Sequence, residues 1–400
     1  MADAGPLAGI TVVEFAGIGP GPYCAMLLAD MGASVVRVDR AGPASADYTP
    51  NPVLERGRRS VAIDLKQPRG RDVVLGLVET ADVLVESFRP GVAERLGLGP
   101  DDCLARNPRL VYGRMSGWGQ DGPLAGAAGH DVNYISLTGA LHAIGRAGER
   151  PVPPLNLVGD FGGGASSLAF GIACALLESG RSGRGQVVDA NVFDSTATLM
   201  ALIHGLRARG RWSARRGDNL LDTGCPYYDV YTCADGRWVA VGTIEERFFS
   251  HLLDVLGLGA DPALVGSHKD RSRWPALRQA LTEVFATRTR DEWAEAFAGV
   301  DACVTPVLDL DEAVAHPHAV ARSSYVPLDD SPYPQPAVAP RFSRSATPVP
   351  SPAVRPGAHT REILAAHGYA DAAVDELLAA GVVAEPEQPE SPFRPGQATG

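Results

Sequence analysis

Ile10-Thr11-Val12-Val13-Glu14-Phe15 is the stretch that decides the fold, because its run of β-branched residues predicts a strand. A glycine- and proline-rich turn at 17–22 follows it, and then a helix over about 22–31, which Gly32 ends. A second strand is predicted at 34–39. Strand, helix and strand together make a βαβ unit, which opens a doubly wound sheet.

The same alternation continues along the chain and predicts an α/β domain. Further strands are predicted at 60–65, 82–86, 109–115 and 187–192, and helices at 69–79, 131–142, 162–179 and 193–209. Residues 211–224 have the composition of a linker into a second module. After it, an Asp-Gly turn joins two strands at 227–232 and 238–243. We therefore expect a large domain at 1–215 and a small α+β domain at 216–339, with a disordered tail at 386–400.

Composition excludes several classes of function. The chain has 400 residues and a net charge of −11, which argues against a general role in nucleic-acid binding. The N-terminal residues lack the features of a signal peptide, and the apolar run at 167–177 is too short to span a bilayer. The six cysteines are scattered without metal-binding spacing. These features predict a soluble cytoplasmic protein with free thiols, with no metal and no membrane partner.

The glycine turn at 17–22 resembles a dinucleotide-binding fingerprint only weakly. Its spacing is G-x-G-x-G with two prolines, and Arg37 stands near the place where an acidic ribose ligand is expected. A tight turn between strand and helix is therefore the favoured interpretation. No redox cofactor is predicted.

Arginines gather near the ends of the early strands, and they indicate a phosphate-bearing ligand. Arg37 and Arg40 close the second strand, and Arg56, Arg58 and Arg59 follow a loop. Arginine binds phosphate through a planar fork of donors, so a ligand with a pyrophosphate and a further phosphate would suit these clusters. A solvated charged face is the alternative.

Two segments carry the candidate chemistry. Gly129-His130-Asp131-Val132-Asn133-Tyr134 holds a histidine beside a carboxylate, and Asp160 stands just before the glycines at 162–164. A histidine and a carboxylic acid from separate segments could face one substrate carbon from opposite sides, as a transfer of a proton from one face to the other requires. The alternative is a structural role for Asp160 as a helix N-cap. The glycine-rich loop at 116–123 is also long enough to carry function.

Together these motifs resemble the class III CoA-transferase superfamily. The segments that fit it are 9–22, 32–39, Phe88-Arg89-Pro90-Gly91-Val92 and 377–383. Three further segments resemble its racemase branch: 129–134, Leu157-Val158-Gly159-Asp160 and Gly242-Thr243-Ile244-Glu245. The resemblance covers residues 8 to about 345.

The resemblance implies an architecture and a set of site residues. The large domain would be Rossmann-like and completed by 340–385, and two chains would form an interlocked homodimer. His130, Asp160 and Glu245 would be catalytic, with Glu245 reaching the site from the partner chain. The implied ligands of CoA and its thioester are Arg37, Arg56, Arg58, Arg59, Arg89, Gly129, Asp131, Asn133 and Tyr134.

The implied activity is interconversion of (2R)- and (2S)-2-methylacyl-CoA thioesters through an enolate. His130 and Asp160 would exchange the α-proton on opposite faces, and CoA would be part of the substrate rather than a cofactor. One alternative is a CoA-transferase in which Asp160 attacks the acyl thioester. Another is a non-catalytic acyl-CoA-binding protein.

Overall fold

The computed structural model describes residues 5–42, 48–329, 331–347 and 349–386. The chain forms two compact units. The first unit draws on Met1–Thr138, Leu155–Leu199 and Ser323–Gly400, and the second on Gly139–Pro154 and Met200–Arg322. The chain thus enters and leaves the second unit earlier than the predicted boundaries at 216 and 339. The predicted disordered tail, apart from Pro386, lies outside the described residues.

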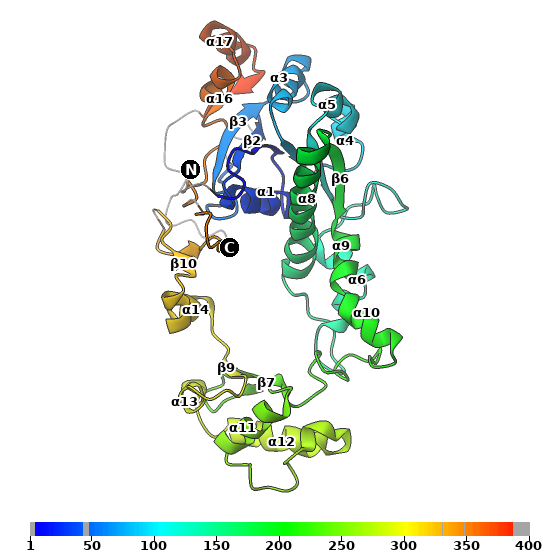
Figure 1. Ribbon diagram of the computed structural model, residues 1–400, viewed down its shortest axis with the longest axis vertical. Coiled ribbons are helices and arrows are strands. Elements are labelled where there is room, and N and C mark those ends of the chain that lie inside the picture. Colours follow the sequence, from blue (N-terminus) through cyan, green and yellow to red (C-terminus); the bar gives the residue numbers. More distant parts are fainter. Residues whose placement is uncertain (1–4, 43–47, 330, 348, 387–400) are drawn as a thin grey trace. The chain divides into compact units, whose positions relative to one another are not determined.

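The first unit is built on a seven-stranded sheet with the order β12-β3-β2-β1-β4-β5-β6. Figure 1 labels β2, β3 and β6 of this sheet. Six strands are parallel, and the short C-terminal strand β12 pairs antiparallel with β3 at one edge. The strands are β1 Thr11–Phe15, β2 Ser34–Arg40, β3 Arg58–Ile63, β4 Val83–Glu86, β5 Val111–Ser116, β6 Gln186–Asn191 and β12 Val383–Ala384. The predicted doubly wound α/β fold is confirmed.

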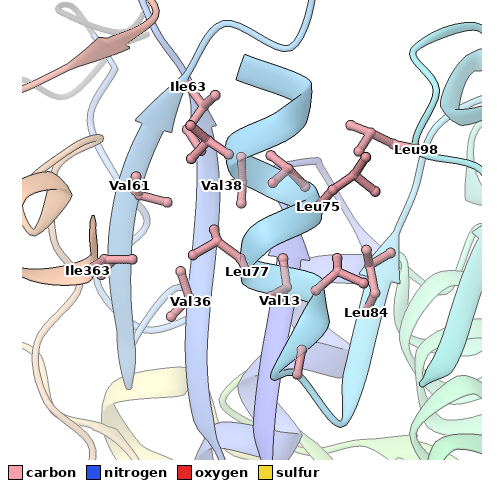
Figure 2. Close-up of a cluster of buried hydrophobic side chains, with 14 of the residues drawn as sticks. Val13, Val36, Val38, Val61, Ile63, Leu75, Leu77, Leu84, Leu98 and Ile363 are labelled. Carbon is pink, nitrogen blue, oxygen red and sulfur yellow. The ribbon is translucent and has the colours of Figure 1, made fainter. Parts of the chain in front are cut away.

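Helices cover both faces of this sheet, because its central strands are apolar on both sides. Figure 2 shows Leu75 and Leu77 on α3 packed over Val13 and Leu84 of the sheet. On the other face, α1 and α8 pack in a second cluster with the remaining strand residues. The helices of this unit are α1 Pro20–Asp30, α3 Pro68–Glu79, α4 Val92–Arg95, α5 Pro100–Arg106, α6 Asp131–Leu137, α8 Ser166–Ser182, α9 Val192–Leu199, α16 Thr360–Ala366 and α17 Asp371–Ala379.

Two predicted helices are interrupted, and a third starts earlier than expected. The helix predicted at 131–142 stops after α6, because Gly139 has a left-handed φ of 83°, and α7 (Ala140–Ala143) follows. The helix predicted at 193–209 is divided into α9 and α10 (Ala201–Ala208). The helix predicted to start at 162 begins as a π-helix, η1 (Leu157–Ala165), which runs directly into α8.

The second unit is a three-stranded antiparallel sheet with helices around it. Its core includes Phe249, Phe285 and Trp293, which are nearly completely buried. The predicted Asp-Gly hairpin is confirmed as β7 and β8. Besides α7 and α10, the elements are β7 Tyr228–Thr232, β8 Trp238–Gly242, α11 Glu246–Val255, η2 Ser267–Lys269, η3 Arg271–Arg273, α12 Trp274–Phe285, α13 Arg290–Ala296, β9 Val304–Pro306, α14 Leu310–Ala315 and α15 Pro317–Ala321. In the first unit, within Ser323–Gly400, β10 (Tyr325–Val326) pairs with β11 (Gln335–Pro336).

Candidate active site

A pocket opens in the first unit at the carboxyl ends of β1, β4 and β5. The loops that follow these strands contribute Gly19, Arg89 and Trp118 to its lining. The strand order reverses between β1 and β4, and open α/β sheets bind ligands at such a switch point. His130 and Asp160 line this same pocket, so the structure brings together the two groups that the sequence predicted.

His130 occupies the position just before the first turn of α6. Its main-chain N–H donates to Asn133 Oδ1 at 3.1 Å, and the Asn133 N–H donates back to the His130 carbonyl at 2.8 Å. This reciprocal pair caps the N-terminal end of α6, with the His130 carbonyl in the place that a side-chain acceptor takes in a capping box. Asn133, predicted to contact the ligand, thus uses its side-chain oxygen to accept a hydrogen bond from the backbone of His130. The His130 side chain is exposed and lines the pocket.

Asp160 lies in the first turn of the π-helix η1, a rare conformation that is frequent at functional sites. Its side chain is half-buried, and burial raises its pKa to about 6. The charge of Asp131 acts in the same direction, whereas a hydrogen bond from Asn156 and the charge of His130 oppose the rise. The carboxyl group therefore retains a protonated population near neutral pH.

The glycine turn before α1 lies against Asp160, which sequence reasoning did not predict. Gly19 has a φ of 71°, and a Cβ built there would stand 3.4 Å from Asp160 Oδ2. A Cβ on Gly21 would stand 1.9 Å from Ser87 Oγ. The favoured interpretation was a tight turn, and the structure adds that its glycines leave room for pocket side chains. The unusual G-x-G-x-G spacing is the sequence feature that could have indicated this close contact.

The glycines after Asp160 serve packing. A Cβ on Gly163 would stand 3.0 Å from Thr196 Oγ1, and one on Gly164 would stand 3.0 Å from Val192 Cγ2. Both contacts are with α9, so these glycines let η1 approach that helix closely.

Tyr134 joins the predicted binding segment to the glycine-rich loop at 116–123. Its hydroxyl donates to the Gly129 carbonyl, and its ring makes an edge contact with Trp118 at 4.8 Å between centroids. A Cβ on Gly117 would stand only 2.1 Å from Tyr134 Cζ. Gly129 and Tyr134 both line the pocket, and Trp118 is a lining residue that the sequence did not single out.

Of the predicted phosphate ligands, Arg89 and Arg37 lie at pockets. Arg89 lines the pocket of His130 and Asp160, and Arg37 lines a second pocket with Arg40. Ile18 contributes to both pockets, so they adjoin. Arg37 is 2% exposed, and its Nε lies 2.8 Å from Asp39 Oδ2.

The other predicted phosphate ligands lie outside both pockets. Arg56 forms an ion pair with Asp30 at 2.6 Å, and Arg58 forms one with Glu14 at 2.6 Å. Both guanidinium groups are buried, whereas Arg59 lies near the surface. The structure thus shows Arg56 and Arg58 engaged with carboxylates of their own chain, and their contact with CoA stays a prediction.

Glu245 belongs to the second unit, at the residue before α11, where it is exposed. It follows the Gly242-Thr243-Ile244 segment after β8. Its predicted role beside His130 stays a prediction. Across the described parts of both units, no group of three or more His, Cys, Asp or Glu side chains is arranged to hold a metal ion.

The fold and the pocket define an α/β protein with a histidine and a protonatable aspartate at the switch point of its sheet. The chain belongs to CoA-transferase family III, whose sequence model matches residues 7–360. The resemblance predicted from the motifs is thereby confirmed.

Two curated relatives are named alpha-methylacyl-CoA racemase. The mouse protein is 45% identical over 373 residues, which are 93% of this chain and 96% of the relative. The human protein is 44% identical over 379 residues, with the same two coverages of 93% and 96%. Among solved structures, a CAIB/BAIF family protein from Brucella suis is 25% identical with a TM-score of 0.78, and the match covers 91% of this chain and 100% of that one.

Proposed function

We propose that this protein is an epimerase that interconverts (2R)- and (2S)-2-methylacyl-CoA thioesters. One observation carries the proposal: His130 and Asp160, from two separate segments, line a single pocket. The names of the mouse and human relatives support the substrate class.

The chemistry follows from the two side chains. The α-carbon of a thioester is weakly acidic, and loss of its proton gives an enolate. In one direction neutral His130 removes the proton and protonated Asp160 supplies another on the opposite face. In the other direction the Asp160 carboxylate removes it and the imidazolium supplies one. Both starting states hold the same number of protons, so the pair titrates as a coupled unit.

The raised pKa of Asp160 suits this dual role. With a pKa of about 6, roughly one Asp160 side chain in ten is protonated at pH 7, compared with fewer than one in a thousand for an ordinary aspartate. A general acid works best when its pKa is near the working pH. The reaction requires no metal ion and no redox cofactor.

The CoA moiety is proposed to extend from the first pocket into the adjoining one. Arg89 lines the first pocket, and Arg37 and Arg40 line the second, where Arg37 is paired with Asp39 and Glu55. The acyl thioester end would then lie near Gly129 and His130, as the motif resemblance implied.

We also propose that the working form is a homodimer, in which Glu245 of a second copy orients His130. The exposed apolar face of α8 supports association, since Phe170 is 72% exposed and Leu177 is 59% exposed. The helical stretch Leu157–Ser182 is long and apolar enough to span a membrane. The core helix of a soluble protein can have the same length and composition. A measurement of molar mass by light scattering tests this proposal, and a monomer that retains full activity would contradict it.

Transfer of CoA between carboxylic acids is the second candidate function, and membership of the family favours it. There the Asp160 carboxylate would attack the thioester carbonyl, the C–S bond would break with release of the CoA thiolate, and a mixed anhydride would form. That mechanism gives no task to His130, which is why epimerisation is the first proposal. A purely binding role would require neither group.

The test is proton NMR of a single epimer of a 2-methylacyl-CoA in deuterated buffer. We expect loss of the α-proton signal and appearance of the other epimer without an added acceptor acid. His130→Ala and Asp160→Ala should each lower the rate by about 10²–10⁴-fold, as loss of a general acid or base does. His318→Ala, at an exposed helix position, is the control. Transfer of CoA to an added acid with the α-proton retained would refute the epimerase proposal.

A further inference from the structure

Asp131 adjoins His130 in sequence, yet its side chain faces the protein interior. It is only 6% exposed. Its Oδ2 accepts a hydrogen bond from the main-chain N–H of Asp160 at 2.7 Å. Its Oδ1 is buried and has no hydrogen-bond partner within the described parts of the chain. Since buried polar atoms are nearly always paired, such a carboxylate requires an explanation.

The hydrogen bond lies at the start of η1. The first N–H groups of a helix have no partner within the helix. Phe161 makes the first π-type bond, from its N–H to the Asn156 carbonyl at 3.2 Å. Asp160 stands one residue earlier, so its N–H must be satisfied from outside the helix. Asp131 on α6 provides that acceptor.

The two segments meet with no room for another side chain. A Cβ on Gly159 would stand 2.3 Å from Asp131 Oδ2 and 2.7 Å from Ile135 Cγ2. Gly159 therefore lets the carboxylate lie directly against the peptide group that precedes Asp160. The contact fixes the main chain of Asp160 relative to the helix that begins after His130.

We propose that Asp131 is a positioning residue for the epimerisation: its carboxylate holds the Asp160 main chain so that the Asp160 side chain stays in the pocket that His130 lines. This inference rests on the proposed function. Sequence resemblance had assigned Asp131 to contact with the thioester, whereas its side chain is engaged with Asp160. Asp131 acts on the reaction through Asp160.

The charge of Asp131 has a second effect on the same residue. The ionisable groups that act on Asp160 are Asp131 and His130, and Tyr134 and Arg89 line the same pocket. Burial is the first cause of the raised pKa of Asp160, and the negative charge of Asp131 is the next. Removing that charge lowers the pH at which Asp160 loses its proton.

Two substitutions separate the hydrogen bond from the charge. Asp131→Asn keeps an oxygen that can accept from Asp160 and removes the charge. Asp131→Ala removes both. Asp101→Asn is the matched control, because Asp101 is an exposed aspartate in the first turn of α5. It changes the net charge by the same amount away from the pocket.

The experiment measures kcat, KM and the pH profile of α-proton exchange with a 2-methylacyl-CoA. For Asp131→Ala we expect kcat to fall by about 10–100-fold with little change in KM, as displacement of a catalytic group does. For Asp131→Asn we expect most of kcat to return. The acid limb of its profile should move to lower pH by roughly one unit, the low end of what a nearby charge produces. Asp101→Asn should match the wild type in all three.

A purely structural Asp131 would give another pattern, in which the variants lose thermal stability but the folded fraction keeps the kcat and pH profile of the wild type. That result overturns the inference. If the alanine variant does not fold, the unshifted profile of the asparagine variant alone overturns it. The wild type is measured first. Absence of α-proton exchange there refutes the proposed function, whereas exchange in the wild type with unaffected variants refutes only the role of Asp131.

Discussion

Replacing Arg58 with methionine tests whether this arginine supports the fold rather than a ligand. The side chains of Arg58 and Glu14 are 0% and 1% exposed, and their charged groups lie 2.6 Å apart. Arg58 also donates to the carbonyls of Leu54 and Pro22. Glu14 Oε1 has no partner in the described residues, so Glu14 depends on Arg58 for compensation of its charge. Removing one member of a buried pair destabilises by about 3–5 kcal/mol.

The assay is thermal and urea unfolding followed by circular dichroism. A loss of this size corresponds to a fall of roughly 6–20 °C in the midpoint for a unit of this size. Arg59→Met is the control, because the Arg59–Glu362 pair is exposed and such pairs contribute less than about 1 kcal/mol. The double variant Arg58→Met with Glu14→Leu should regain most of the stability, since an apolar pair replaces a buried ion pair with little loss.

The loss should also depend on pH, with a sign set by Glu14. Burial raises the pKa of Glu14, and Arg58 opposes that rise. A carboxyl group whose pKa is higher in the folded than in the unfolded state destabilises the fold increasingly as pH rises above its unfolded value. Without Arg58 the folded-state pKa rises further, so the stability of Arg58→Met should decline as pH rises from the acidic range towards neutrality.

The reasoning is refuted if Arg58→Met unfolds like the wild type while its KM for the acyl-CoA rises. Arg58 would then be a ligand of CoA, as the motif resemblance implied. A fall in stability with unchanged KM would establish the ion pair as its role.

Two further predictions concern close contacts. Gly159→Ala should lower the rate of α-proton exchange by about 10–100-fold with the fold retained. The reason is that the new Cβ would stand 2.3 Å from Asp131 Oδ2 and displace that carboxylate. An unchanged rate would contradict the importance of this contact. Asp229→Ala should destabilise the second unit by about 1–3 kcal/mol, because Asp229 accepts from both Arg146 and Arg278. Hydrogen exchange should then show faster opening at 139–154, and unchanged protection there would contradict the prediction.

Local pattern predicted most of the large unit. The strands at the centre of the sheet are rich in valine and leucine, and the helices between them have an apolar face, so both their type and their alternation followed from the sequence. The convergence of His130 and Asp160 was also predicted from their motifs. The interruption at Gly139 and the π-helix at Leu157 were not, because hydrophobic periodicity does not report the φ of one glycine or a change in helical pitch.

The ion-pair partners of three buried arginines could not be predicted from the sequence pattern. The type and clustering of Arg37, Arg56 and Arg58 predict phosphate ligands. Each is buried against carboxylates that come from other segments. Arg56 also donates to Gln335, which lies 279 residues away in sequence. No local rule selects such a partner.

The sequence by itself therefore determined the order of strands and helices and predicted that His130 and Asp160 belong to one site, because both depend on residue type and short spacing. Only the tertiary structure decided which oxygen satisfies the Asp160 N–H, which carboxylate neutralises each arginine, and that Asp160 has a pKa of about 6. The physical reason is that burial and charge act through space. They depend on groups that the chain brings together from distant positions, and these distances do not exist until the sheet and its covering helices have packed.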